Sequence, residues 1–150
     1  MALGSPFDVT GAAHIPDRDR RGGSTLIRLE GFRVSVDYRM NELKRLLKRF
    51  RFMDLLEGVG AEALWQSVRD ATLLTDQGNR AVWRVSTAPT KGPDLVAQVA
   101  QSLDVQWFYD WGGGLVWIST PIDGDAGASV LREATRAFGG HATLVRAPAV

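Results

Sequence analysis

Cysteine is absent from this chain of 150 residues, and only two histidines, His14 and His141, are present. The absence of thiols excludes disulfide bonds, iron-sulfur ligation, thiolate zinc sites and thiol nucleophiles. Two histidines this far apart in the sequence argue against a zinc site, so no metal centre is expected. A chain without cysteine is also compatible with a reducing compartment, and a cytoplasmic location is expected.

The chain also lacks an excess of charge and any long apolar run. Lysine and arginine total 18 against 17 acidic residues, so the net charge is +1. This balance, and the lack of basic residues among the aromatic ones at 104–120, argue against a nucleic-acid partner. No apolar run approaches the roughly 20 residues of a membrane span, and the first residues do not resemble a signal peptide, so no membrane insertion is expected.

Aromatic residues are concentrated at 104–120, which holds three of the five tryptophans. Two alternating runs, 105–109 and 115–119, are joined by Gly112-Gly113-Gly114, a pattern that predicts a β-hairpin. Three glycines allow a sharp turn or the close approach of a ligand. The hydrophobic content of 45% suits one compact domain.

Residues 81–146 predict a strand, helix, strand, strand, helix, strand order. This is the split βαβ order of ferredoxin-like proteins, in which both helices cover one face of an antiparallel sheet. The predicted fold class is therefore α+β. The elements are a strand at 81–86, a helix opened by Pro93, the hairpin, a helix after Asp123-Gly-Asp125 that ends at Gly139-Gly140, and a strand at 141–146.

The preceding residues predict an extension of this core. Residues 1–24 combine glycine, proline and a charge cluster, which predicts an N-terminal arm or loop with a short strand at Ala12–Ile15. Residues 25–150 then form a single domain, with the ferredoxin-like core at about 81–146. The other expected elements are a strand at Thr25–Glu30, a helix from the N-cap Ser35 to Phe50, a short strand at Arg51–Leu56, a helix at 61–71 and a polar turn at 76–79.

Six short pieces of sequence carry a resemblance to one enzyme family. Together they resemble the C-terminal region of the FAD-binding subunit of bacterial glycolate oxidase, a flavoprotein of the vanillyl-alcohol-oxidase type. The resemblance covers most of the chain. The pieces are Ser5-Pro-Phe7 with Gly11-Ala12; Arg28-Leu-Glu-Gly31 with Ser35-Val36 and Tyr38-Arg39; Leu64-Trp65 with Arg69-Asp70; Trp83-Arg-Val-Ser86; Asp110-Trp-Gly-Gly113; and Gly140-His-Ala-Thr-Leu144.

The resemblance implies a region that caps the isoalloxazine ring of FAD, while an N-terminal domain, absent from these 150 residues, holds most of the flavin. The chain also lacks a dinucleotide fingerprint, because Gly112-Gly113-Gly114 lies within a hairpin and not between a strand and a helix. We therefore expect a cap domain, as a fragment or a separate subunit, of an enzyme that oxidises glycolate or another 2-hydroxy acid. Alone, the chain is expected to be inactive and to bind no FAD. The implied partners are a flavin domain, a catalytic FAD subunit and an iron-sulfur subunit.

Five residues are candidate contacts for the cofactor: Arg84, Trp111, Gly112, Gly113 and His141. An arginine on a strand could hold a carboxylate with two hydrogen bonds, or it could simply face solvent. Trp111, beside the glycines, is expected to be exposed. His141 could act as a base near a flavin, or it could close a helix-to-strand turn with a backbone hydrogen bond. No catalytic residue is identified from the sequence.

Two further interpretations stay open. Trp107 and Trp117 are expected in the core, since aromatic residues at alternating strand positions usually pack within the sheet. The basic helix face could dock an acidic partner subunit or be solvated; it comprises Arg39, Lys44, Arg45, Lys48, Arg49 and Arg51. The alternative function is a free-standing ferredoxin-like module that binds a small effector or a protein without redox activity.

Overall fold

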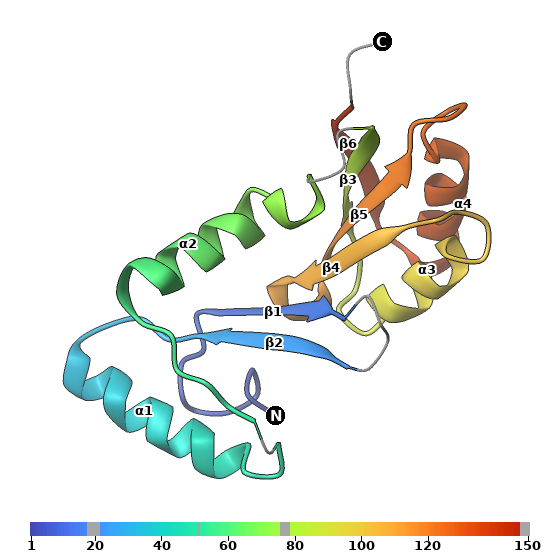
Figure 1. Ribbon diagram of the computed structural model, residues 1–150. Coiled ribbons are helices and arrows are strands. Elements are labelled where there is room, and N and C mark those ends of the chain that lie inside the picture. The colour runs from blue at the N-terminus through green and yellow to red at the C-terminus, as the bar shows by residue number, and fades with distance from the viewer. Residues whose placement is uncertain (18–21, 51, 76–78, 148–150) are drawn as a thin grey trace.

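A computed structural model describes residues 1–17, 22–50, 52–75 and 79–147 of the chain (Figure 1). The strands are β1 (Gly11–Pro16), β2 (Gly23–Arg28), β3 (Arg80–Ser86), β4 (Gln106–Asp110), β5 (Leu115–Pro121) and β6 (His141–Arg146). The helices are α1 (Arg33–Leu46), α2 (Gly58–Arg69), α3 (Gly92–Val99) and α4 (Ala128–Phe138), with short 3-10 turns η1 (Thr72–Leu74) and η2 (Trp111–Gly113).

The described strands form one sheet in the order β2-β1-β4-β5-β3-β6, and every neighbouring pair is antiparallel. The last four strands of this order, with α3 and α4, have the topology of the split βαβ unit. The predicted α+β fold with a ferredoxin-like arrangement is therefore confirmed. β1 and β2 extend the sheet beyond β4, where His14 lies opposite Tyr109.

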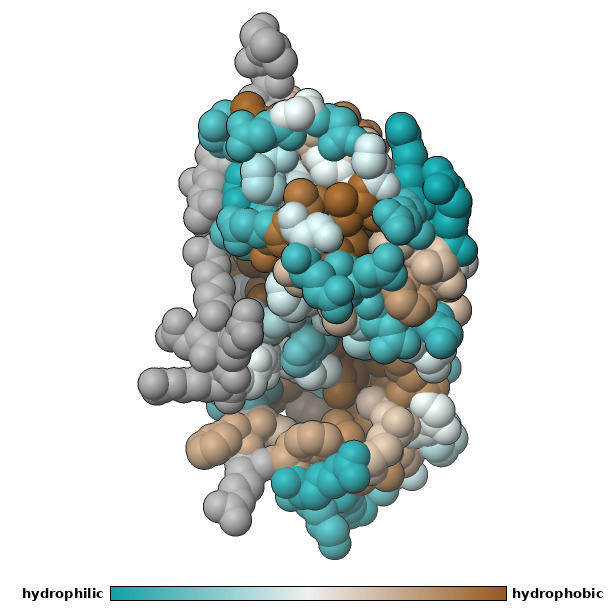
Figure 2. Space-filling view, turned by 90° about the vertical axis from the view of Figure 1, so that its right-hand side faces the viewer, coloured by the Kyte–Doolittle hydropathy of each residue, from teal (hydrophilic) through white to brown (hydrophobic). Residues whose placement is uncertain are grey.

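Side chains on the two faces of the sheet belong to separate core clusters. Trp83 and Val85 of β3 pack with Ile118, Leu95 and Leu131, so α3 and α4 cover one face. That side of the molecule presents mostly hydrophilic residues around a small apolar patch (Figure 2). Burying each large side chain of this cluster contributes about 1.5–3 kcal/mol, which makes the cluster the main anchor of the split βαβ unit.

The second core cluster lies on the opposite face. Val82 of β3 and Trp117 of β5 pack there with Phe108, with Val68 of α2 and with Ala13 of β1. The alternation along β3 and β5 therefore distributes neighbouring residues between two cores. Because α2 approaches this face, it forms one wall of the site described below.

Within the N-terminal arm or loop predicted at 1–24, residues 11–16 form β1, which pairs along its whole length with β2 and buries Ala13. The short strand expected at Ala12–Ile15 is confirmed within it. The charge cluster at 18–21 lies outside the described residues. The strand is stable because its hydrogen bonds to β2 and β4 and its one buried side chain outweigh the polar composition around it.

The region between β2 and β3 departs from the prediction in two ways. α1 begins at Arg33, with Phe32 and not Ser35 at the N-cap, and it ends at Leu46 and not at Phe50. Residues 52–56 form no strand, and all of them are exposed. An apolar run needs a partner strand to bind its backbone groups, and none lies beside the described part of this run. Arg51 and residues 76–78 of the expected turn lie outside the described residues.

Two other helix starts follow their sequence signals. Pro93 occupies the first turn of α3, where its missing N-H costs no hydrogen bond. Asp125 accepts hydrogen bonds from the backbone N-H groups of Gly127, at 3.0 Å, and Ser129, at 2.7 Å, and so caps α4. None of the described helices has the length and apolar character needed to cross a membrane.

Candidate functional site

A cavity of about 830 Å³ lies between α2, the N-terminal segment and the sheet face opposite α3 and α4. Its wall is built from separate parts of the chain: β2, α2, β3, η2 and β5 each contribute at least one side chain. Eight of the 17 residues that line it are charged or aromatic. They are Arg28, Glu62, Trp65, Arg69, Arg84, Asp110, Trp111 and Trp117.

Arg84 lies on β3 between Trp83 and Val85, whose side chains are buried on the opposite face. The alternation of the strand therefore directs Arg84 toward the cavity, which it lines. Its guanidinium carbon lies 5.0 Å from the centre of the Trp111 ring. Arg84 makes no ion pair or hydrogen bond with any described residue. A half-buried cation without a carboxylate partner favours an anionic ligand.

Trp111 stands at the turn of the β4-β5 hairpin, with a positive φ of 51° and an exposed fraction of 59%. The Asp110 carboxylate accepts a hydrogen bond from the Trp111 backbone N-H at 2.7 Å, which holds the turn. The predicted exposure of Trp111 is confirmed. Gly112 follows it with φ of 62° and also lines the cavity. The glycine-rich turn thus lets an indole ring project over Arg84.

Arg28 and Trp65 form a second cation and aromatic pair in the wall. The guanidinium carbon of Arg28 lies 4.9 Å from the centre of the Trp65 ring. Nε of Arg28 is 3.4 Å from a carboxylate oxygen of Glu30, but the pair lacks hydrogen-bond geometry. The indole face offsets part of the cost of holding this charge in a half-buried position.

Asp110 is the half-buried acidic group of the cavity. Burial raises the pKa of its carboxyl group, while the hydrogen bond from the Trp111 N-H and the charge of Arg28 act in the opposite direction. A carboxyl group with a raised pKa binds a proton more readily than an exposed aspartate. Its charge partly offsets that of the arginines, and protonation would strengthen the preference of the cavity for anions.

Trp117 combines a core position with a place in the cavity wall. It is 7% exposed and packs on Phe108, with the two ring centres 6.4 Å apart, which confirms the predicted core position. Its indole Nε1 is buried and has no hydrogen-bond partner within the described ranges. A buried N-H without a partner costs about 1–3 kcal/mol, and this N-H is closed off from the cavity because it has almost no accessible surface. Trp107 is partly buried against the first cluster.

The structure brings three of the five predicted site residues together at this cavity: Arg84, Trp111 and Gly112. Gly113 and His141 do not line it. A Cβ on Gly113 would lie 2.7 Å from the carbonyl oxygen of Pro89, so Gly113 is needed for close backbone packing. His141 is exposed at the start of β6, opposite Ser86. His141 therefore lies away from this cavity, and its contact with a flavin stays a prediction.

Sequence reasoning missed Arg28, Trp65 and the second role of Trp117. Arg28 and Trp65 come from β2 and α2, and neither belongs to a local motif with a known ligand. They meet only because β2 and α2 lie along the same end of the sheet. Among the described residues, no three histidine, aspartate or glutamate side chains are placed to hold a metal ion.

Comparisons with protein-family models, with curated proteins and with solved structures give no significant match. The function is therefore argued from the chemistry of the cavity. Cations beside indole faces favour a small anion with a planar part. A carboxylate attached to or lying against a flat ring system has this character.

Proposed function

We propose that the chain is the cap, or substrate-side, domain of a flavin-dependent 2-hydroxy-acid oxidase of the glycolate oxidase type. The observation that carries the proposal is the Arg84 guanidinium beside Trp111 in the cavity wall, with no acidic partner among the described residues. In this role Arg84 binds the substrate carboxylate with its two-pronged guanidinium. A cytoplasmic location belongs to the same proposal.

The pieces of sequence that carry the resemblance support this assignment by their positions. Five of the six supply residues to the cavity wall, although they are spread over the whole chain. These residues are Gly11 and Ala12 from the first piece, Arg28 from the second, Trp65 and Arg69 from the third, Arg84 from the fourth, and Asp110, Trp111 and Gly112 from the fifth. Pieces that are far apart in the sequence thus contribute residues to the same cavity.

The cavity suits the flat ring of a flavin better than the whole of FAD. Trp65, Trp111 and Trp117 offer indole surface to a planar ring. The described residues provide no dinucleotide fingerprint between a strand and a helix. Gly112 and Gly113 lie in a hairpin, and the Gly-x-Gly-x-x-Ala sequence at 58–63 opens α2 with no described strand directly before it. The loop from β5 to α4 contains Gly124 and Gly127, but its aspartates, Asp123 and Asp125, would repel a pyrophosphate. We therefore assign the pyrophosphate to a partner that carries a flavin domain, and we propose that the isolated chain is inactive.

In the proposed reaction the 2-hydroxy acid would become a 2-oxo acid. A flavin supplied by the partner would provide the oxidation, taking up the hydride of the carbon that bears the hydroxyl group, while the hydroxyl proton would pass to solvent. Arg84 orients the carboxylate, and the indole rings exclude water from one side of the substrate. The electrons then pass to an iron-sulfur subunit, which together with a catalytic FAD subunit completes the proposed set of partners.

A flavin titration tests the proposal. The purified chain is titrated with FAD and followed by absorbance, with and without a coexpressed flavin domain of a glycolate oxidase. We expect saturable binding of flavin, and oxidation of glycolate, only when the flavin domain is present. Stoichiometric binding of FAD and oxidation of glycolate by the chain alone would contradict the inactive-cap assignment.

A second candidate function is a free-standing module that binds a small anion without redox activity. It is favoured by the fact that Arg84, Arg28 and the indole rings all belong to this chain, so the cavity can take a ligand without a flavin. Calorimetric titration with glycolate, and with an indole or phenyl carboxylate, in the absence of flavin separates the two candidates. Tight binding of such a ligand, with no effect of the flavin domain, would favour the module.

A further inference from the structure

Exposed apolar side chains gather on α1 and on the segment that follows it. Ten of the fifteen large hydrophobic residues exposed in the described part of the chain lie at 32–59. Phe52 is 93% exposed and Phe32 is 90% exposed, values typical of an unfolded segment. The ten residues are Phe32, Val34, Tyr38, Leu46, Phe50, Phe52, Met53, Leu55, Leu56 and Val59. Such a concentration on one part of a folded chain marks an interaction surface.

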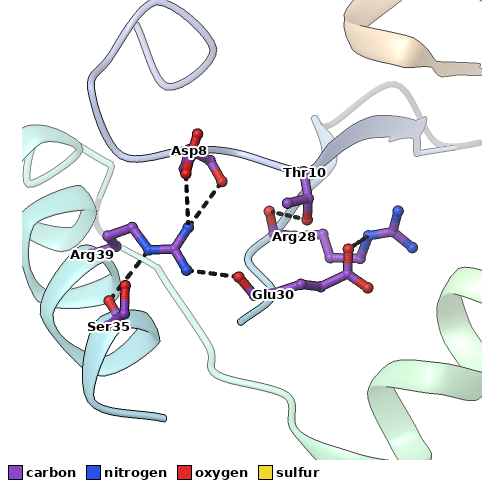
Figure 3. Close-up of polar contacts among 6 residues, drawn as sticks. All are labelled: Asp8, Thr10, Arg28, Glu30, Ser35 and Arg39. Carbon is purple, nitrogen blue, oxygen red and sulfur yellow. Dashed lines mark hydrogen bonds and ion pairs between the residues drawn. The ribbon is translucent and has the colours of Figure 1, made fainter. Parts of the chain in front are cut away.

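Few buried contacts hold this surface in place, and polar contacts add to them. Leu43 of α1 is buried, at 5% exposed, but neither hydrophobic cluster includes it. Arg39 donates hydrogen bonds to the carbonyl oxygens of Glu30, at 2.7 Å, and Asp8, at 3.2 Å (Figure 3). Its Nε also donates to the carbonyl oxygen of Ser35 at 3.3 Å. α1 is thus positioned by Leu43 and Arg39, while Val34, Tyr38 and Leu46 stay exposed.

Positive charge borders the apolar residues. Lys44, Arg45, Lys48 and Arg49 lie within six positions that contain no acidic residue. Arg45 forms an ion pair with Glu42, but Lys44 and Lys48 form no ion pair with any residue that the structure describes. Arg49 stacks on Phe50, with its guanidinium carbon 4.9 Å from the ring centre. Carboxylates are the groups that would complement these cations.

A protein fits this surface better than an anionic membrane does. Asp54 and Glu57 lie in the same stretch as Phe52 and would be repelled by anionic lipid. Residues 52–56 form no backbone hydrogen bond with other described residues. Lipid chains cannot satisfy such backbone groups, whereas a protein partner can. At the lower end of Figure 2, where α1 ends in Figure 1, apolar and hydrophilic surface lie side by side.

We infer that α1, Phe50 and residues 52–59 form a docking surface for a folded protein whose contact patch is apolar at its centre and lined with carboxylates at its rim. The inference rests on the proposed function in one respect, since the partner used to test it is the flavin-carrying protein of that proposal. Docking would cover Phe52 and Val59 and would place carboxylates opposite Lys44 and Lys48. The surface is separate from the cavity, since none of its residues lines the cavity wall.

The test measures the affinity of the full chain for the coexpressed flavin domain by calorimetry, in low and high salt. Two double variants alter the docking surface: F52D with V59D, and K44E with K48E. We expect each to weaken binding at least about tenfold, and the charge reversal also to reduce the salt dependence. Matched controls lie elsewhere: L144D with V145D on β6, where both residues are exposed, and R132E with R136E on α4. Circular dichroism verifies that all variants fold.

Each outcome decides the inference. Loss of affinity in the docking variants, with the controls within about twofold of the unmodified chain, supports it. Binding that is equal in all variants overturns the docking surface and leaves the proposed function intact. No binding by the unmodified chain overturns both. Two other results also overturn it, provided that the docking variants still bind the flavin domain. One is that these variants lose sedimentation with vesicles of phosphatidylcholine and phosphatidylglycerol. The other is that they lose self-association.

Discussion

The Arg84 guanidinium carbon lies 5.0 Å from the centre of the Trp111 ring, although the two residues stand on different elements of the sheet. The register of β3 and β5 brings them together. Arg84 is opposite Trp117, and the β4-β5 hairpin turns back at Trp111 beside the same end of β3. The indole stabilises a cation that has no acidic partner among the described residues, and so keeps it available for an anion.

Replacing Arg84 by glutamine removes this charge and leaves a shorter, neutral polar side chain. We expect carboxylate binding to weaken by about tenfold or more, since a charge-assisted hydrogen bond contributes about 1.5–3 kcal/mol. Stability should change by less than about 0.5 kcal/mol, because Arg84 forms no ion pair within the described ranges. The measurement is calorimetric titration with glycolate in the presence of the flavin domain. The matched control is R132Q on the exposed side of α4, and equal affinity for both variants would contradict a role for Arg84.

Replacing Asp110 by asparagine tests the effect of burying a carboxyl group. Burial raises its pKa in the folded chain above that in the unfolded chain, so Asp110 lowers the free energy of unfolding as the pH rises through the folded pKa. Asparagine can still accept the hydrogen bond from the Trp111 N-H. We therefore expect D110N to be more stable than the unmodified chain at pH 7 and equally stable below the unfolded pKa of about 3.9, in urea titrations at both pH values.

The pKa of Asp125 is shifted in the opposite direction from that of Asp110, so replacing Asp125 by asparagine should have the opposite effect on stability. The side chain of Ser129, followed by backbone N-H groups, lowers the pKa of the Asp125 carboxyl group. Its contribution to stability is therefore present above about pH 3.9 and is lost as the pH falls through the lower folded pKa. D125N should be less stable at pH 7, and the difference should close in acid. Equal responses of D110N and D125N to pH would show that burial at Asp110 has no effect.

The split βαβ core could be predicted because its periodicity is local. Trp83 and Val85 alternate with Val82 and Arg84 on a strand, and the pattern alone separates the two faces. The same reasoning placed Arg84 and Trp111 as candidate contacts. The strand predicted over residues 52–56 is wrong, because an exposed apolar run has the same composition as a strand. A strand differs from such a run in having a partner strand, and the presence of a partner depends on the fold and not on the segment itself.

The cavity as a whole could not be predicted from the sequence. Arg28 and Trp65 lie far apart along the chain, and their contact depends on how β2 and α2 pack at the end of the sheet. His141 is a candidate because histidine is a versatile base, with a turn-closing role as the alternative, but residue type carries no information on which side of the sheet a strand end lies. Both Arg28 and Trp65 belong to the pieces of sequence that carry the resemblance, although the sequence did not indicate that they lie together.

Replacing Arg39 by methionine tests how α1 is attached. Arg39 is only 11% exposed and joins α1 to Asp8 and Glu30. Without these hydrogen bonds we expect the free energy of local opening of α1 to fall by about 2 kcal/mol, and its amides to exchange roughly 30-fold faster. Hydrogen exchange followed by mass spectrometry measures this. R33M is the control, because Arg33 forms an exposed ion pair within the same helix, and α1 should exchange there as in the unmodified chain.

Two adjacent glycines after α4 test how tightly β6 is held to β3. Gly140 has φ of 121°, and a Cβ there would overlap the carbonyl oxygen of Ser86. Gly139 also has a positive φ, of 78°, but a Cβ there would meet nothing within 4 Å. G139A therefore adds only backbone strain, about 1 kcal/mol, whereas G140A adds strain and a clash with the backbone of β3, together about 3 kcal/mol or more.

For a chain of this size the larger loss corresponds to a decrease in Tm of roughly 6–12 °C for G140A and a few degrees for G139A. Thermal unfolding followed by circular dichroism measures both. The backbone of β3 cannot move away from Gly140 without disturbing Trp83 and Val85, which are buried beneath α3 and α4. Equal values of Tm for the two variants would mean that β6 can separate from β3 at little cost, and that the edge of the sheet is looser than the register at Ser86 and His141 indicates.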